Sequence, residues 1–62
     1  MTRTYAAKRL LEHGSLSFAE FHQITGWTEK QCRKTIDALQ EQILIEPDTK
    51  RGTYRLAERA RP

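Results

Sequence analysis

The chain has 62 residues, enough for one small domain, which buries only about 60% of the surface that its unfolded form exposes. Its 11 Lys and Arg residues outnumber its 8 Asp and Glu residues, so the net charge is +3. This basic balance makes nucleic acid the first partner to consider. The chain has little room for an enzyme cleft and no evident nucleophile–base pair or paired catalytic carboxylates, so we expect no enzymatic activity.

The single cysteine, Cys32, excludes an internal disulfide, and its spacing from His13 and His22 does not match a metal site. We therefore expect no metal ion and no cofactor, with Cys32 as a buried core thiol. There is no long apolar run, so neither a signal peptide nor a membrane span is expected. These absences predict a cytoplasmic location without a membrane partner.

The first predicted helix covers residues 5–13, which are rich in good helix formers. Thr2 or Thr4 can cap its start, and Gly14 is expected to end it as a left-handed cap. Residues 15–16 then form a short extended link.

A second, shorter helix is predicted over residues 18–24. Ser17 and Glu20 match a capping box, in which each side chain accepts a hydrogen bond from the backbone of the other. Thr25 and Gly26 supply the following turn, because glycine tolerates a positive φ. A short helix, a turn with glycine and a longer amphipathic helix are the parts of a helix-turn-helix.

The third predicted helix covers residues 29–42, since Thr28 and Gln31 form a second capping-box pair. Trp27 is expected to pack ahead of this cap as a hydrophobic staple. At about 100° per residue, the apolar residues of the helix share one narrow stripe, and charged residues take the opposite face. The stripe consists of Cys32, Ile36, Leu39 and Ile43.

The outer face of this helix carries Lys30 and Lys34, four residues apart, where like charges cost about 0.2–0.5 kcal/mol. Such repulsion suggests an anionic partner. Gln31 and Arg33 flank the same two turns, and amide and guanidinium donors of this kind read base edges and bind phosphates. The alternative is a solvated face in which Arg33 pairs with Asp37 at the i+4 position.

Two short β-prone runs, residues 44–46 and 53–56, flank a basic turn and predict a hairpin. Because an isolated hairpin is marginal in water, it must pack on the helices, where residues 15–16 can pair with it as a third strand. Which face of the hairpin is inward is left open. The domain is placed at residues 1–56, and residues 57–62 are expected to form a mobile basic tail without an apolar contribution.

This order of elements resembles a winged helix-turn-helix DNA-binding domain, a mostly α fold with three helices and a small β-hairpin. Within that superfamily the pattern is most similar to the DNA-binding half of GntR-type repressors. The matching positions are Gly26, Thr28, Cys32, Arg33, Leu39, Leu44, Ile45, Glu46 and the run Arg51-Gly52-Thr53-Tyr54. The resemblance implies that Arg33 contacts DNA from the recognition helix and that Arg51 and Gly52 at the wing tip reach the minor groove.

Two features depart from the GntR pattern. Glu29 stands where those repressors commonly carry an arginine that reads a base. The glutamate can instead accept from a cytosine N4 amine or favour the helix N-terminus. The chain also ends where such repressors continue into an effector-binding domain, so we expect no small-molecule effector.

The function expected from the sequence is specific binding of double-stranded DNA by a small phage, plasmid or bacterial transcription regulator. In this hypothesis the helix at 29–42 enters the major groove and the wing at 47–52 contacts the backbone or minor groove. The expected DNA-binding residues are Thr28, Lys30, Gln31, Arg33, Lys34, Lys50, Arg51, Gly52 and Arg55.

A module of this size buries only about 600–1,000 Å² of protein surface on DNA, so useful affinity is expected to need a homodimer or an accessory protein. The alternative is a protein-interaction winged helix that acts as an inhibitor or adaptor in a larger complex. Asp37 and Glu41 favour this alternative, because carboxylates are poorly placed along a phosphate backbone.

Overall fold

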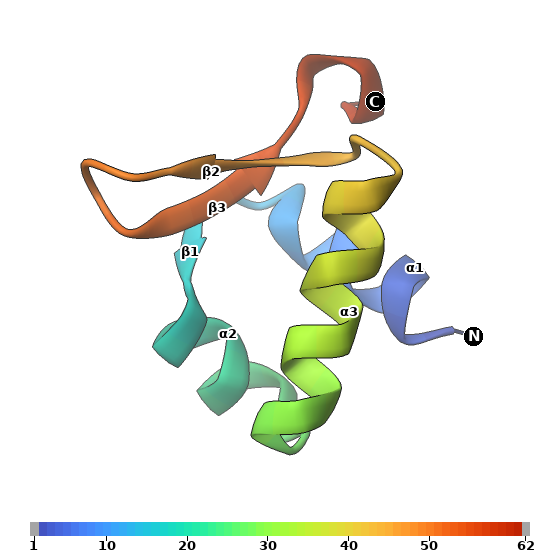
Figure 1. The fold of residues 1–62 in the computed structure, drawn as a ribbon, viewed down its shortest axis with the longest axis vertical. Helices are drawn as coiled ribbons and strands as arrows, with labels where there is room; N and C mark the ends of the chain where they lie inside the picture. Colours follow the sequence, from blue (N-terminus) through green and yellow to red (C-terminus); the bar gives the residue numbers. More distant parts are fainter. Residues whose placement is uncertain (1, 62) are drawn as a thin grey trace.

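The computed structural model describes residues 2–61 as three α-helices and a three-stranded antiparallel sheet (Figure 1). This confirms a mostly helical fold with a small sheet. No helix in the described residues is long and apolar enough to cross a membrane. The elements in chain order are α1 (Arg3–Leu11), β1 (Leu16–Ser17), α2 (Phe18–Thr25), α3 (Glu29–Glu41), β2 (Ile45–Asp48), β3 (Thr53–Leu56) and the 3-10 helix η1 (Glu58–Ala60).

Helix α1 begins and ends two residues earlier than expected. The Thr2 hydroxyl accepts a hydrogen bond from the Tyr5 N–H at 3.2 Å, which fixes the start of the helix at Arg3. The regular helix stops at Leu11, and a turn follows it. Gly14 lies beyond this turn with a φ of 149°, far from the left-handed helical value, so it is not the expected cap.

Helices α2 and α3 each start at the predicted capping box. The Glu20 carboxylate accepts from the Ser17 N–H at 3.0 Å, and the Ser17 hydroxyl accepts from the Glu20 N–H at 3.2 Å. Thr28 and Gln31 make the same two bonds, both at 3.1 Å. Gly26 ends α2 with a φ of 70°, as expected for the glycine of this turn.

Helix α3 ends in a Schellman motif, in which Ile43 occupies the left-handed position. The Leu44 N–H donates to the Leu39 carbonyl and the Ile43 N–H donates to the Gln40 carbonyl, both at 2.9 Å. Ile43 has a φ of 57° and is 60% exposed. The expectation that Ile43 extends the apolar stripe is therefore wrong, because the helix stops at Glu41 and Ile43 lies beyond it in the left-handed conformation.

The sheet has the order β1-β3-β2, and the predicted third strand is present, shifted by one residue. Its register pairs Leu16 with Tyr54. On the other side of β3, Ile45 of β2 lies opposite Leu56, and both side chains are buried. These two residues identify the face of the hairpin that packs on the helices.

The core lies among the three helices and the inner face of the sheet. Cys32 is fully buried, as expected, and its sulfur lies 3.7 Å from the Thr25 hydroxyl and 3.9 Å from the Trp27 carbonyl oxygen. The Trp27 ring meets Phe21 of α2 edge to face at a centroid distance of 5.7 Å. The turn between α2 and α3 is therefore held by the contacts of Cys32 with Thr25 and Trp27 and by the packing of Trp27 on Phe21. The buried cluster consists of Ala7, Leu11, Phe21, Cys32, Ile36, Leu39, Ile45, Leu56 and Ala60.

The segment after Leu56 differs from the tail expected from the sequence. It forms η1, and both Ala57 and Ala60 are buried. The Ala57 N–H also donates to the Leu44 carbonyl at 2.9 Å. Alanine methyl groups are too small to show as an apolar stripe, yet two of them cover the end of the core here. The compact unit thus extends at least to Ala60.

Candidate nucleic-acid interface

The solvent-facing side of α3 carries charged residues along its first two and a half turns. In Figure 1, α3 crosses in front of α1. A shallow hollow runs along it and is lined by Glu29, Lys30, Arg33, Lys34 and Asp37. Because none of these five side chains is buried, all of them are available to a partner.

Arg33 is held by two neighbours on the side of α3 that faces α2. Its guanidinium donates to the Glu29 carboxylate at 3.2 Å and 3.4 Å, and its carbon Cζ lies 5.2 Å from the centre of the Phe18 ring. The interpretation in which Arg33 pairs with Asp37 is therefore wrong. A glutamate four residues before a cation is the favoured orientation on a helix, and the aromatic ring adds attraction on the same side.

The ion pair between Glu29 and Arg33 is a weak constraint, since the two side chains are 65% and 68% exposed. Pairs as exposed as this contribute about 0–1 kcal/mol. Arg33 can therefore exchange the carboxylate for a base or phosphate at small cost, while Phe18 keeps its guanidinium near the surface of α3.

Lys30 and Lys34 are exposed and have no ion-pair partner among residues 2–61. Lys30 and Lys34 lie between two hollows. Besides the hollow along α3, they line a second hollow that extends to Arg3 and Thr4 at the start of α1. Sequence reasoning missed Arg3. The available signal was its position in the first turn of a helix, where an acidic residue is favoured and a basic one is not.

Thr28 and Gln31 are largely occupied with starting α3. The Thr28 hydroxyl and the Gln31 side-chain oxygen are both used by the capping box. The amide nitrogen of Gln31 has no hydrogen-bond partner within the described part of the chain, so it can donate two hydrogen bonds to a ligand, whereas the Thr28 hydroxyl has one proton to donate. Of this pair, Gln31 is the better candidate for contact.

The loop between β2 and β3 is held in shape by Asp48. Its carboxylate accepts from the backbone N–H groups of Lys50 at 3.1 Å and Arg51 at 3.3 Å, and its carbonyl accepts from Gly52 at 2.8 Å. Gly52 has a φ of 67°, which favours glycine. Lys50 and Arg51 are thus presented on an ordered tip with both side chains exposed.

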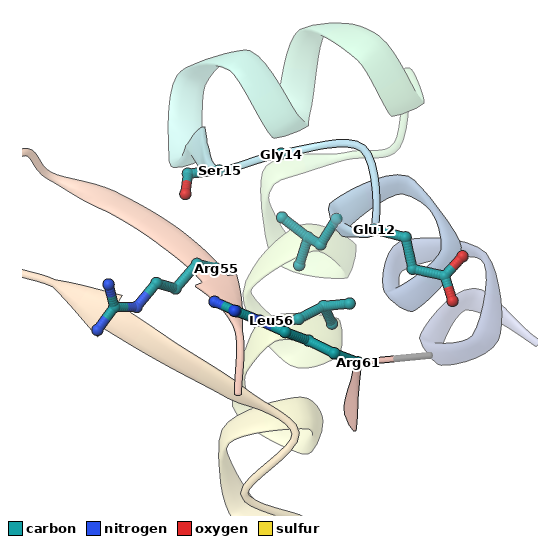
Figure 2. Close-up of a pocket in the computed structure, with 7 residues that line it drawn as sticks. Glu12, Gly14, Ser15, Arg55, Leu56 and Arg61 are labelled. Carbon is teal, nitrogen blue, oxygen red and sulfur yellow. The ribbon is translucent and has the colours of Figure 1, made fainter. Parts of the chain in front are cut away.

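Arg55 lies apart from the other expected contact residues. Its guanidinium pairs with Glu46 across the hairpin at 3.3 Å. It also lines a hollow of about 520 Å³ that includes Glu12 and Arg61 but no residue of α3 (Figure 2). Arg33 also has a carboxylate beside it, so the feature that sets Arg55 apart is its position in a hollow away from the cations of α3.

The carboxyl group of Glu20, in the first turn of α2, has a shifted pKa. The hydrogen bond from the Ser17 backbone N–H, with the Ser17 hydroxyl contact in second place, lowers the pKa of Glu20 below its ordinary value. Glu20 therefore keeps its negative charge in the capping box of α2, whereas the capping box of α3 contains the neutral Gln31 and the carboxylate in the first turn of α3 is that of Glu29.

The structure thus brings Lys30, Arg33 and Lys34 together on α3 and presents Lys50 and Arg51 on the hairpin tip. Comparisons of the chain with protein-family models, with curated proteins and with solved structures give no match.

Proposed function

We propose that this chain is a winged helix-turn-helix module that binds double-stranded DNA, with α3 in the major groove and the hairpin tip on the adjacent backbone or minor groove. The observation that carries the proposal is the exposed cluster of Lys30, Arg33 and Lys34 on the helix that follows the Gly26 turn. Helix α3 has 13 residues, so it is about 20 Å long. A helix of that size fits a major groove about 12 Å wide.

Within this proposal, Arg33 contacts a base and the lysines contact phosphates. Arginine binds the O6 and N7 atoms of guanine through two parallel hydrogen bonds, a geometry that lysine cannot match. Glu29 lies beside Arg33 and can accept from the N4 amine of a cytosine. The pair therefore favours sites with G·C base pairs under the start of α3. Lys50 and Arg51 add contacts from a loop that Asp48 has already ordered.

The runner-up is a protein-interaction module with the same fold. Asp37 supports it, because this exposed carboxylate lines the same hollow as the three cations and opposes a phosphate lying flat along α3. Exposed Ile24 and Ile43 are also available to a protein partner. On DNA, Asp37 is tolerated only when α3 enters the groove by its N-terminal end.

Salt dependence separates these two functions. Binding to duplex DNA releases condensed counterions, which gives a slope of log affinity against log salt of about −0.9 per phosphate contact. With Lys30, Lys34, Lys50 and Arg51 on the backbone, we expect a slope of about −3 to −5 per monomer. Fluorescence anisotropy with a random duplex and with a duplex selected from a random pool measures it. Affinity no tighter than about 10⁻⁴ M at low salt would show that the DNA-binding proposal is wrong.

Replacing Arg33 with Ala distinguishes a base contact from a phosphate contact. A bidentate contact predicts a loss of about 1–3 kcal/mol on the selected duplex and a smaller loss on the random one. Equal losses on both duplexes would assign Arg33 to the backbone. Circular dichroism of the variant checks that α3 is retained, since the side chain is exposed and leaves no cavity.

A further inference from the structure

The hollow between the starts of α1 and α3 lies on the opposite side of Lys30 and Lys34 from Arg33. Its volume is about 470 Å³, large enough for a phosphate group with bound water. Helix α1 contributes Arg3 and Thr4 to it. The lining residues are Arg3, Thr4, Thr28, Lys30, Gln31, Lys34 and Thr35.

The charges around this hollow are all of one sign. Arg3, Lys30 and Lys34 line it, and none of them forms an ion pair within residues 2–61. The nearest carboxylates along α3, those of Glu29 and Asp37, line the other hollow instead. Three cations that share one hollow repel each other, and a bound anion would relieve this repulsion.

The neutral groups in the hollow are also suited to an anion. The free amide nitrogen of Gln31 is a donor, and a glutamate at that position would have placed a carboxylate beside the lysines. Arg3 and Thr4 are the first two residues of α1, and their N–H groups have no acceptor within the helix. These donors are a secondary contribution, because the three side-chain charges carry the attraction.

We infer that this hollow binds a phosphate of the DNA backbone, so that the start of α1 forms one edge of the DNA interface and Arg3 is a contact residue. The inference rests on the proposed function and extends it to a part of the chain outside the helix-turn-helix and the hairpin. In this arrangement Lys30 and Lys34 contact the bound phosphate from α3, and Arg3 contacts it from α1 on the other side of the hollow.

The experiment compares Arg3→Gln with Arg9→Gln in the full chain, using the selected and random duplexes at several salt concentrations. Both variants remove one exposed arginine charge from α1, and Arg9 lies outside this hollow, where its pair with Glu12 contributes little. We expect Arg3→Gln to flatten the salt slope by about 0.9 and to weaken binding about five- to tenfold at about 0.1 M salt, equally on both duplexes. Arg9→Gln should leave the slope unchanged.

A double variant, Arg3→Gln with Lys30→Gln, tests whether the two side chains share one phosphate. Residues that bind the same group are coupled, so the combined loss should differ clearly from the sum of the two single losses. Wild-type binding combined with an unchanged slope in Arg3→Gln would overturn this inference and leave the proposed function standing. Failure of the wild-type chain to bind either duplex would overturn both.

Discussion

Helices α2 and α3 are built with the same devices at both ends but from different residues. Each begins at a capping box, with Ser17 and Glu20 in α2 and Thr28 and Gln31 in α3. The four hydrogen bonds have nearly equal lengths, from 3.0 to 3.2 Å. The difference is charge, because the α2 box carries a carboxylate and the α3 box a neutral amide.

Their C-terminal ends differ in a second way. Each helix is followed by a residue in the left-handed conformation, Gly26 with a φ of 70° and Ile43 with a φ of 57°. Glycine adopts this conformation without strain, whereas a left-handed L-residue costs about 1–2 kcal/mol, and a β-branched one is a genuine outlier. Helix α2 thus has a stabilising residue at each end, Glu20 in its capping box and Gly26 at its C-terminus.

Helix α3 thus differs from α2 at both of its ends, because its capping box is uncharged and an isoleucine takes the left-handed position. At its start, an uncharged capping residue keeps the hollow beside Arg3, Lys30 and Lys34 free of carboxylates. That departure has a reason in the proposed function. At its end, nothing in the structure explains why an exposed isoleucine occupies the left-handed position.

The largest expected effect comes from Gln31→Glu, which gives α3 the capping box of α2. The Ser17–Glu20 pair shows that glutamate makes both hydrogen bonds, so folding stability should change little. A carboxylate in the hollow should weaken duplex binding about tenfold, or about 1.4 kcal/mol, and flatten the salt slope by about one. Anisotropy measures both. Glu20→Gln, the reverse change in the other box, should leave binding within about twofold of wild type.

An intermediate effect is expected from Ile43→Gly, which gives α3 the ending of α2. Relief of the left-handed strain exceeds the extra entropy of glycine, so the free energy of unfolding should rise by about 0.5–1 kcal/mol. Urea denaturation measures this value. Ile24→Gly is a matched control, since Ile24 is similarly exposed but helical, and it should lose about 1 kcal/mol. Destabilisation by Ile43→Gly would reveal that the isoleucine makes a stabilising contact.

The smallest expected effect is on the loss of folding stability at acidic pH, to which Glu20 contributes. Because the pKa of Glu20 is lowered in the folded chain, its ionised form contributes stability above the ordinary value of 4.5, and this contribution is lost as the pH falls through the folded pKa. Glu20→Gln keeps an acceptor but does not titrate, so its thermal midpoint should fall less between about pH 5 and about pH 3 than that of wild type. Parallel curves for the two proteins would contradict the lowered pKa.

The local signals in the sequence predicted most of the fold. Both capping boxes, the Gly26 turn, buried Cys32 and the hairpin depend on residues at most a few positions apart, and all are present. Some errors are local, at the two ends of α1 and at Ile43, and the others concern residues whose position depends on distant contacts. Arg33 has Phe18 as a neighbour, and Ala60 is buried only because η1 folds back onto the core.

The candidate surface could be predicted from the sequence only where its residues belong to one helix. Lys30, Lys34 and Arg33 share a helix, so their spacing alone placed them on one surface. Arg3 comes from the other end of the domain, and nothing in the spacing between residues 3 and 30 indicates that they line one hollow. Arg55 has the right charge, but its cross-strand register places Glu46 beside it.

The sequence by itself determined where α2 and α3 start, because a capping box is complete within four residues and needs no tertiary contact. It also determined which face of α3 is apolar, through the helical period. Only the tertiary structure decided which side of the hairpin is inward and that the start of α1 lies beside the lysines of α3. Those features depend on packing between segments far apart in the chain, which a local pattern does not encode.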